Sequence, residues 1–318
     1  MVKKSFTMIE MIFVIVILSF IITGGLLVTS KIYKRNFIAA KYLELSFNTE
    51  QTIDKLANML YYRVPLSAIG YNPSNGEYKA LDDIGDDENF TVFEWIGYSA
   101  DLYKDINFSG FADLYASNKP VFKAIDFNVS FIDEVEKNKF HTDKGFKDIT
   151  GIIFAGSFDR GEEESEGDYN DSFGWHGGKA KYIYIIDDYN VSDNDANLSL
   201  KNSDGSDITH ARIYEKFYLV DSAYAVALKK DLNADNWNCS EYNYSDLKND
   251  DLLLFYDYRP WKGESFCGDG GSGRVEILSG HIAGFHIQAV NNHLEIFFKS
   301  LYKRGGIVIK VSKQKVVF

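Results

Sequence analysis

Glu10 is the residue whose surroundings most constrain its chemistry. It follows a basic leader, Lys3-Lys4-Ser5, and precedes an uncharged run from residue 11 to residue 30. At the helical rise this run covers about 30 Å, roughly the thickness of bilayer hydrocarbon. A carboxylate near the start of a membrane segment costs several kcal/mol unless it reaches water or meets a cation. The pattern therefore predicts a membrane helix in which Glu10 forms a charge pair.

The same stretch resembles the N-terminus of type IV prepilins and of the pseudopilins of type II secretion. The resemblance rests on the basic leader, the small residue Ser5, Phe6 followed by Thr7, and Glu10 at the fifth position counted from Phe6. Two positions depart from the family pattern, which usually has glycine or alanine in place of Ser5 and leucine in place of Met8. Both substitutes are small or apolar, so we expect slower processing at most.

This resemblance implies cleavage by prepilin peptidase between Ser5 and Phe6, followed by methylation of the new amino group of Phe6. It also implies that Glu10 pairs with the Phe6 ammonium of a neighbouring subunit during filament assembly. Such a pair is physically reasonable, because each charge alone lacks a partner in a low-dielectric medium. The implied partners are other pilins or pseudopilins, the peptidase, the inner-membrane assembly platform and membrane lipid.

A secretory signal peptide and a plain signal anchor are the competing explanations of this N-terminus. A secretory signal places its cleavage site after the apolar core, whereas residues 21–25 are followed by more apolar residues and no clear Ala-x-Ala site. A signal anchor gives no reason for Glu10. A third alternative keeps the membrane helix but lets the Glu10 carboxylate extend to the lipid headgroups without a partner.

The charges that flank the apolar run disagree about its orientation. Lys3 and Lys4 precede it, yet Lys31, Lys34 and Arg35 follow it, so a simple count places the C-terminal side in the cytoplasm. Long domains translocate largely regardless of charge, and the cleavage motif requires a cytoplasmic N-terminus. We therefore predict a single-pass protein of the bacterial inner membrane, with a periplasmic C-terminal domain, which enters the filament on assembly.

The only two cysteines, Cys239 and Cys267, both follow the membrane segment. In an oxidising periplasm such a pair is most simply a disulfide, which would stabilise the fold by about 3 to 4 kcal/mol. Neither a CxxC spacing for redox chemistry nor a zinc-ligand spacing is present. The sequence therefore predicts a Cys239–Cys267 disulfide.

Oxygen-bearing residues alternate in two acidic loops, at Asp231, Asn233 and Asp235 and at Asp193, Asp195 and Asn197. Calcium loops begin in this way. Neither loop has the glycine at its sixth position or the glutamate at its twelfth that an EF-type loop requires. We interpret both as solvated turns, and Asp231, Asn233 and Asp235 are kept only as weak calcium candidates.

Catalytic motifs are absent from the sequence. Its six histidines are His141, His176, His210, His281, His286 and His293, and none belongs to an HExxH motif. GxSxG and glycine-rich phosphate loops are also missing. His176 precedes Gly177-Gly178, and we interpret it as a turn residue. We predict no enzymatic activity, no cofactor and no other metal site.

The formal net charge of −12 limits the classes of partner. Removal of residues 1–5 deletes two lysines and gives −12 − 2 = −14. A domain this acidic repels phosphate backbones, and no cluster of Lys and Arg interleaved with aromatic residues suggests a local basic patch. Direct nucleic-acid binding is therefore not expected.

The element that must position Glu10 is one long helix. Apolar positions continue past the membrane run at three- and four-residue steps, at Ile38, Tyr42, Leu45, Thr49, Ile53, Leu56 and Leu60. Pro65 ends this pattern, since the residue before a proline is disfavoured in helical conformation. We predict a helix from Phe6 to about Tyr62 whose second half lies on a sheet.

Beyond Pro65 the chain changes to short strands and polar loops. Alternation predicts strands at residues 121–131, 149–155, 181–186, 213–220, 223–228 and 252–258. A C-terminal meander is predicted at residues 281–290, 293–301 and 307–317, with turns at Asn291-Asn292 and Arg304-Gly305-Gly306. A helix followed by antiparallel strands predicts an α+β, pilin-like fold with an enlarged periplasmic lobe.

The C-terminal part of the chain also resembles the later half of J-type pseudopilins and W-type minor pilins. This looser resemblance is carried by residues 214–220, 252–255 and 277–285. The presence of Glu10 argues against a K-type tip pseudopilin, which usually lacks that acid.

We therefore predict a leader peptide at 1–5, a transmembrane half-helix at 6–30, an amphipathic periplasmic half-helix at 31–64 and a β-rich globular domain at 65–318. The expected protein is a minor pseudopilin or minor pilin that primes or caps a fibre. Subunits of type II secretion systems, type IV pili and DNA-uptake systems share this kind of N-terminus. The sequence therefore does not distinguish among the three systems. The alternatives are a pilus-tip adhesin or substrate-binding subunit and a membrane-tethered periplasmic enzyme.

Overall fold

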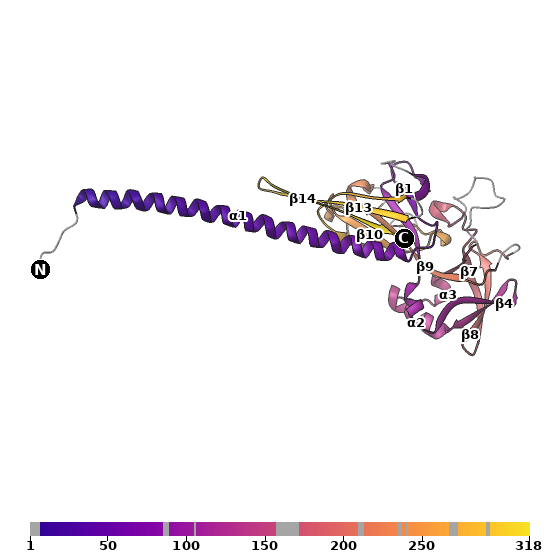
Figure 1. Cartoon of the computed structure of the whole chain (residues 1–318). Helices are drawn as coiled ribbons and strands as arrows, with labels where there is room; N and C mark the ends of the chain where they lie inside the picture. Colours follow the sequence, from indigo (N-terminus) through magenta and orange to yellow (C-terminus); the bar gives the residue numbers. More distant parts are fainter. Residues whose placement is uncertain are drawn as a thin grey trace.

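The structure is a long helix that is free at one end and embedded at the other end in a β-rich body (Figure 1). It is a computed structural model that describes residues 7–84, 89–104, 106–156, 172–208, 213–234, 237–239, 241–266, 273–290 and 293–318. The start of α1 and the body lie at opposite ends of the described structure. The apolar half of the helix therefore projects away from the folded part.

Helix α1 (Met8–Tyr61) is continuous over 54 residues. Every residue from 7 to 37 is exposed, and burial begins only in the second half of the helix. The helix ends where Tyr62 donates its backbone N–H to the carbonyl of Met59 at 3.2 Å, and Val64 then donates to Ile96 in a strand at 2.8 Å. The end of the helix before Pro65 and its continuity agree with the sequence prediction over the described residues.

The larger sheet contains eleven antiparallel strands. They are β1 (Ile69–Asn72), β2 (Glu77–Ala80), β3 (Val92–Tyr98), β4 (Phe108–Asn118), β5 (Val121–Phe127), β6 (Gly151–Phe154), β7 (Tyr184–Ser192), β8 (Asp195–Asn202), β9 (Phe217–Leu228), β10 (Leu252–Tyr258) and β11 (Arg274–Ser279). Their order is β2-β1-β3-β9-β6-β7-β8-β5-β4, with β10 between β9 and β11 in a branch.

Strand β9 joins two halves of this sheet. Residues 217–220 pair with β6, residues 220–226 pair with β3 and residues 223–228 pair with β10. The half that begins at β6 curls until β4 returns to the chain just before β9, where Phe111 forms a bridge with Lys216 and the Ala112 N–H donates to the Glu215 carbonyl at 2.7 Å. This half is therefore closed like a small barrel around its own phenylalanine-rich core.

Two short helices cover the barrel-like half. Helix α2 (Val129–Phe140) is capped by Asn128, whose side chain accepts the Phe131 N–H at 3.1 Å. Helix α3 (Phe146–Ile149) is held against α2, because the Phe146 N–H donates to Asp133 at 2.6 Å. Ile132 of α2 and Phe146 of α3 are fully buried in the barrel core.

A separate three-stranded sheet contains β12 (Ile282–Val290), β13 (His293–Arg304) and β14 (Ile307–Val317) in sequence order. Leu294, Ile296 and Phe298 of β13 point inward to a core that they share with Ile53 and Leu56 of α1. The larger sheet closes the same core with residues of β3, β9 and β10. The second half of α1 is thus held between two antiparallel sheets, as the predicted α+β class requires.

The strand predictions are confirmed most closely at β10 and β14 and less closely elsewhere. Residues 213–220 and 223–228 were expected as two strands, but residues 217–228 form the single strand β9. The strand expected at residues 121–131 ends at Phe127, because Asn128 starts helix α2. Tyr42, expected on the buried stripe of the helix, is 49% exposed.

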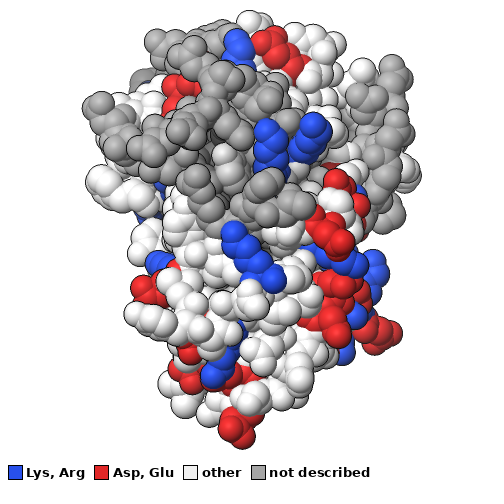
Figure 2. All heavy atoms as spheres, turned by 90° about the vertical axis from the view of Figure 1, so that its right-hand side faces the viewer, with Lys and Arg blue, Asp and Glu red and all other residues white. Residues whose placement is uncertain are grey.

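Charge at the end of the body farthest from the N-terminus is mixed. Figure 2 shows this end, where acidic side chains gather on one side and positive side chains are separated by uncharged and acidic ones. The part of this end that the structure describes therefore has no continuous basic surface.

Candidate functional site

The N-terminal turn of α1 places Glu10 against Thr7. The Thr7 hydroxyl accepts the Glu10 N–H at 3.4 Å, and the Glu10 carboxylate accepts the Thr7 N–H and hydroxyl, each at 2.9 Å. This reciprocal arrangement is a capping box, which satisfies backbone donors at the start of a helix. The carboxylate therefore already has a partner within its own chain. Ser5 and Phe6 lie outside the described residues, so their predicted cleavage and methylation stay predictions.

The capping box is a feature that our sequence analysis missed although the sequence contains its signal. Thr7 and Glu10 have the S/T-x-x-E spacing that marks a helix start ahead of an apolar run. Recognising it would have shown that Glu10 has a local structural role besides any role between subunits. Both roles have to be separated in an experiment.

The first half of α1 is long and apolar enough to cross a membrane, judged by length and composition. Its side chains contact no other element, and those of Phe13, Phe20 and Leu26 are each more than 60% exposed. A water-soluble protein rarely exposes so long an apolar surface. The surface is therefore suited to lipid or to other apolar helices.

The second half of α1 has one apolar face that is buried and a second apolar face that is exposed. The face containing Leu45, Ile53 and Leu56 is buried against the sheets. Leu43 and Phe47, one helical turn apart, remain 67% and 61% exposed. Part of the apolar surface of α1 thus continues beyond the membrane-length segment and stays available to another molecule.

The cysteine prediction can be followed for one of its two residues. Cys239 packs beside the core of the larger sheet and is not a free thiol. Cys267 lies outside the described residues. The Cys239–Cys267 pairing therefore stays a prediction.

The weak calcium candidates lie after strand β9. Asp231 ends the short 3-10 helix η5 (Lys229–Asp231), where burial raises the pKa of its carboxyl. Asn233 follows in the chain, and Asp235 lies outside the described residues. Within the described residues, no three His, Cys, Asp or Glu side chains gather as a metal cluster. In the other acidic loop, Asp195 already binds Lys123 at 2.8 Å.

His176 occupies a turn, as expected, but it also has a buried partner that the sequence did not reveal. It lies in the 3-10 helix η4 (Trp175–Gly177) with a φ of 47°. Its Nε2 is 2.6 Å from the buried carboxylate of Glu94, which also accepts the Tyr258 hydroxyl at 2.8 Å. Tyr71 stacks on the imidazole with ring centroids 3.9 Å apart. The group fixes the turn against strands β1 and β3.

A second buried group contains Glu136, Asp221 and Lys139. Lys139 of α2 forms an ion pair with Asp221 of β9, and the Glu136 carboxylate accepts the Ser99 hydroxyl at 2.6 Å. One oxygen each of Glu136 and Asp221 is buried without a hydrogen-bond partner. Burial, and then the charge of Asp221, raises the pKa of Glu136 to about 8.

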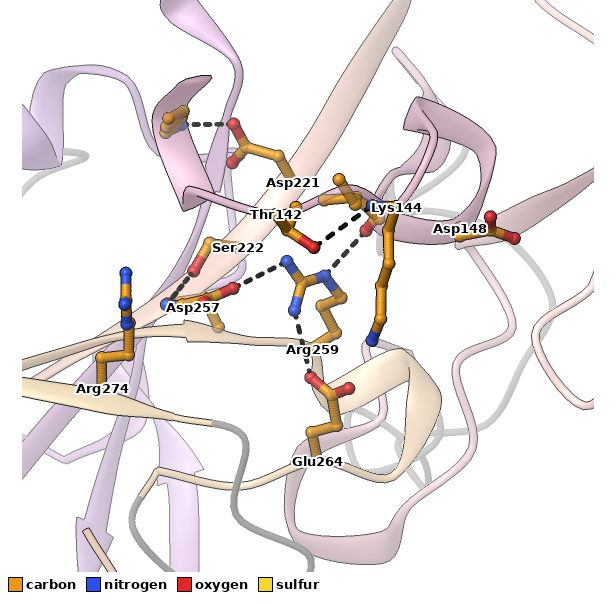
Figure 3. Close-up of polar contacts among 12 residues, drawn as sticks. Thr142, Lys144, Asp148, Asp221, Ser222, Asp257, Arg259, Glu264 and Arg274 are labelled. Carbon is orange, nitrogen blue, oxygen red and sulfur yellow. Dashed lines mark hydrogen bonds and ion pairs between the residues drawn. The ribbon is translucent and has the colours of Figure 1, made fainter. Parts of the chain in front are cut away.

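Arg259 organises a third polar group, drawn in Figure 3. Its guanidinium lies between Asp257, at 2.9 Å, and Glu264, at 3.4 Å, and its Nε donates to the Ile149 carbonyl at 2.8 Å. The Asp257 N–H in turn donates to the Ser222 hydroxyl at 2.8 Å. These bonds join β9, β10 and the chain before β6, so they connect the two halves of the larger sheet.

Two hollows lie at the three-stranded sheet, away from these buried groups. One, of about 480 Å³, is lined by His286, Phe297 and Lys299. The other, of about 580 Å³, lies between α1 and the β13–β14 hairpin and is lined by Phe37 and Tyr302 among others. The polar groups with the strongest pKa shifts thus do not line either hollow.

Comparisons of the chain with models of protein families, with curated proteins and with solved structures found no match.

Proposed function

We propose that this chain is a membrane-anchored minor pilin or pseudopilin, a subunit of a type IV filament system that helps to prime or cap the fibre. The observation that carries the proposal is the two-part helix α1. Its first half is a fully exposed apolar rod of membrane length, and the same helix then continues into a body built from antiparallel sheets. The prepilin-like N-terminus supplies the expected processing site between Ser5 and Phe6.

The exposed apolar positions beyond the membrane-length segment support assembly through the helix. Leu43 and Phe47 lie on a face of α1 that neither sheet covers. A filament made by lateral packing of such helices would bury this face together with the first half of α1. The body would then lie on the outside, with its barrel-like half farthest from the helix bundle.

Glu10 is proposed to bind the Phe6 ammonium of a neighbouring subunit, in addition to capping its own helix. The carboxylate oxygen Oε2 serves the capping box with Thr7. A carboxylate has about four acceptor positions, so a charged donor from another subunit can be added without breaking the cap. Membrane insertion does not need this pair, whereas subunit docking does.

The test compares Glu10→Ala, Glu10→Gln and Thr7→Val in the native host. Thr7→Val removes the hydroxyl of the capping box but leaves the carboxylate, so it is the matched control for loss of the cap. We expect all three variants to insert and to be processed, and only the two Glu10 variants to lose filament incorporation, measured in the sheared filament fraction. Normal incorporation of Glu10→Ala would refute the pairing. Mass spectrometry that shows an intact Met1 in protein from the native host would refute the prepilin assignment.

One observation favours a second candidate function, adhesion or substrate binding at the fibre tip. Strand β4 forms an edge of the larger sheet at the end of the body opposite the N-terminus (Figure 1). It exposes Phe111, Leu114 and Tyr115, the last completely. The first part of β4 is already joined to the chain before β9 at Phe111 and Ala112, so a ligand would contact the exposed side chains of Leu114 and Tyr115 rather than a free strand edge. Exposed tyrosine side chains are typical of binding surfaces. Loss of binding but not of assembly in Tyr115→Ser would favour this function.

A further inference from the structure

The β13–β14 hairpin extends along α1 toward its apolar half. Lys315 of β14 binds Asp54, Ile309 packs on Leu45 farther down the helix, and Tyr302 of β13 contacts Phe37 with ring centroids 6.4 Å apart. Figure 1 shows the tip of this hairpin lying beside α1, outside the rest of the body. Among the described residues of the body, the hairpin therefore reaches farthest toward the apolar first half of α1.

The position of the hairpin along α1 corresponds to the headgroup region of a bilayer. Phe37 is seven residues beyond the end of the apolar run at Ser30, which is about 10 Å at the helical rise. The polar region of a leaflet begins at the end of the hydrocarbon and is several ångströms thick. Long Lys and Arg side chains at this height reach phosphate groups by extending along the helix.

A hollow of about 580 Å³ opens between the helix and the hairpin at this height. Phe37 and Tyr302 form its aromatic wall, and Lys41, Lys303 and Arg304 supply positive charge at its rim. Tyrosine next to Lys and Arg is typical of the membrane interface, and basic pockets of this kind bind anionic headgroups. The wall also contains Asp250, 3.2 Å from His281, and Lys41 is paired with Glu44 at 2.5 Å, so the positive charge available to a ligand comes from Lys303 and Arg304.

Two further positive side chains lie on α1 between this hollow and the apolar run. Lys31 and Lys34 lie at three- and four-residue steps below Ile38, so they share the helix face that contacts the hairpin. Within the described part of the chain, neither of them, nor Lys303 or Arg304, is in an ion pair. Lys31, Lys34, Lys303 and Arg304 thus form a basic band, which is unexpected in a chain of net charge −12. The charge of this band is complementary to phosphate.

We propose that the hollow between α1 and the β13–β14 hairpin binds the phosphate-bearing headgroup of an anionic phospholipid. Lys303 and Arg304 contact the phosphate, Lys31 and Lys34 attract the surrounding anionic lipids, and Phe37 and Tyr302 pack on the glycerol region. The bound lipid fixes the height and rotation of the body above the membrane. This inference requires that α1 lies in a bilayer, as the proposed function does, but not that the chain joins a filament.

The test uses the full chain in lipid nanodiscs that contain equal amounts of phosphatidylglycerol and phosphatidylcholine. The lipids that remain bound after release are counted by native mass spectrometry. The variant Lys303→Gln with Arg304→Gln is compared with Lys119→Gln with Lys230→Gln, which removes the same charge from exposed positions elsewhere in the body. We expect the wild type to retain phosphatidylglycerol preferentially, the first variant to lose the preference by about tenfold or more, and the control to keep it.

Four results would overturn the proposal: no preference in an inserted wild-type chain, an unchanged preference in the hairpin variant, an equal loss in the control, or displacement of the lipid by excess inorganic phosphate. Displacement would identify soluble phosphate as the ligand. Self-association that the hairpin variant abolishes, without any lipid preference, would assign the cations to the acidic surface of a second copy. Failure of the wild type to insert would instead overturn the membrane placement itself, and with it the proposed function.

Discussion

Protonation of Glu136 links the stability of this protein to pH. Glu136 and Asp221 are fully buried, and one lysine, Lys139, faces both of them. Burial is the largest single influence on Lys139 and lowers its pKa, but Asp221, Tyr224 and Glu136 together outweigh it, so the pKa of the lysine is raised. Burial and then the neighbouring Asp221 raise the pKa of Glu136 to about 8, and Lys139 offsets only part of this rise. Arg259 lowers this pKa only as a minor influence.

The sign of the pH effect follows from proton binding. The ordinary pKa of a glutamate is 4.5 here, against about 8 in the folded protein. Between these values the folded chain holds more protons than the unfolded chain, so the free energy of unfolding falls as the pH rises. The slope approaches 1.4 kcal/mol per pH unit. Between pH 6 and pH 9 the loss attributable to Glu136 is therefore on the order of 3 kcal/mol.

Glu136→Gln isolates this contribution, because the amide keeps an acceptor for the Ser99 hydroxyl but does not titrate. Urea unfolding of the detergent-solubilised full chain is measured at pH 6 and pH 9 for the wild type, Glu136→Gln and Glu134→Gln. Glu134 is an exposed acid of the same helix and serves as the control. We expect the stability of Glu136→Gln relative to wild type to rise by about 3 kcal/mol from pH 6 to pH 9. Equal changes in all three proteins would refute the buried-proton reasoning.

Three further predictions concern packing, backbone conformation and the cysteines. Ile53→Ala should lower the free energy of unfolding by about 2 to 4 kcal/mol in urea denaturation, because this side chain is 1% exposed between α1 and the sheets. Gly174 and Gly177 both have positive φ, but only at Gly174 would an added Cβ meet the Pro260 carbonyl oxygen, at 2.7 Å. Gly174→Ala should therefore lower the melting temperature clearly more than Gly177→Ala. Cys239→Ser should lower the unfolding free energy by about 3 kcal/mol and create one thiol that alkylation detects without reductant.

The sequence predicted the elements whose pattern is local. The apolar run and the stripe that includes Leu45 and Ile53 specify α1, since helical spacing alone identifies them. Strand β10 has an uninterrupted apolar start at residues 252–255, and its bounds were correct. The capping box of Thr7 and Glu10 is local too, and it could have been read from the sequence.

Elements that depend on distant partners could not be predicted in the same way. Asp221 and Ser222 look like a turn between two strands, but they lie inside β9 because Lys139 of α2 pairs with the carboxylate and the Asp257 N–H bonds the hydroxyl. Strand β3 was missed, and its buried Glu94 is paired with His176, 82 residues away. Polar residues of this kind interrupt the apolar pattern that predicts a strand. Only the folded structure shows the distant partners that allow them to be buried in one.

The contacts between α1 and the C-terminal strands also determine how late in synthesis the body can finish folding. Thr49 meets Ser300 at a separation of 251 residues, and Asp54 meets Lys315 at a separation of 261. Because the chain is synthesised from its N-terminus, the inner face of α1 consequently stays uncovered until nearly all of the strands have been made. Such late closure slows folding and leaves an apolar surface open to mispairing. A chaperone that shields this helix face should therefore raise the yield of native protein, and it should act before β14 is added to the fold rather than after.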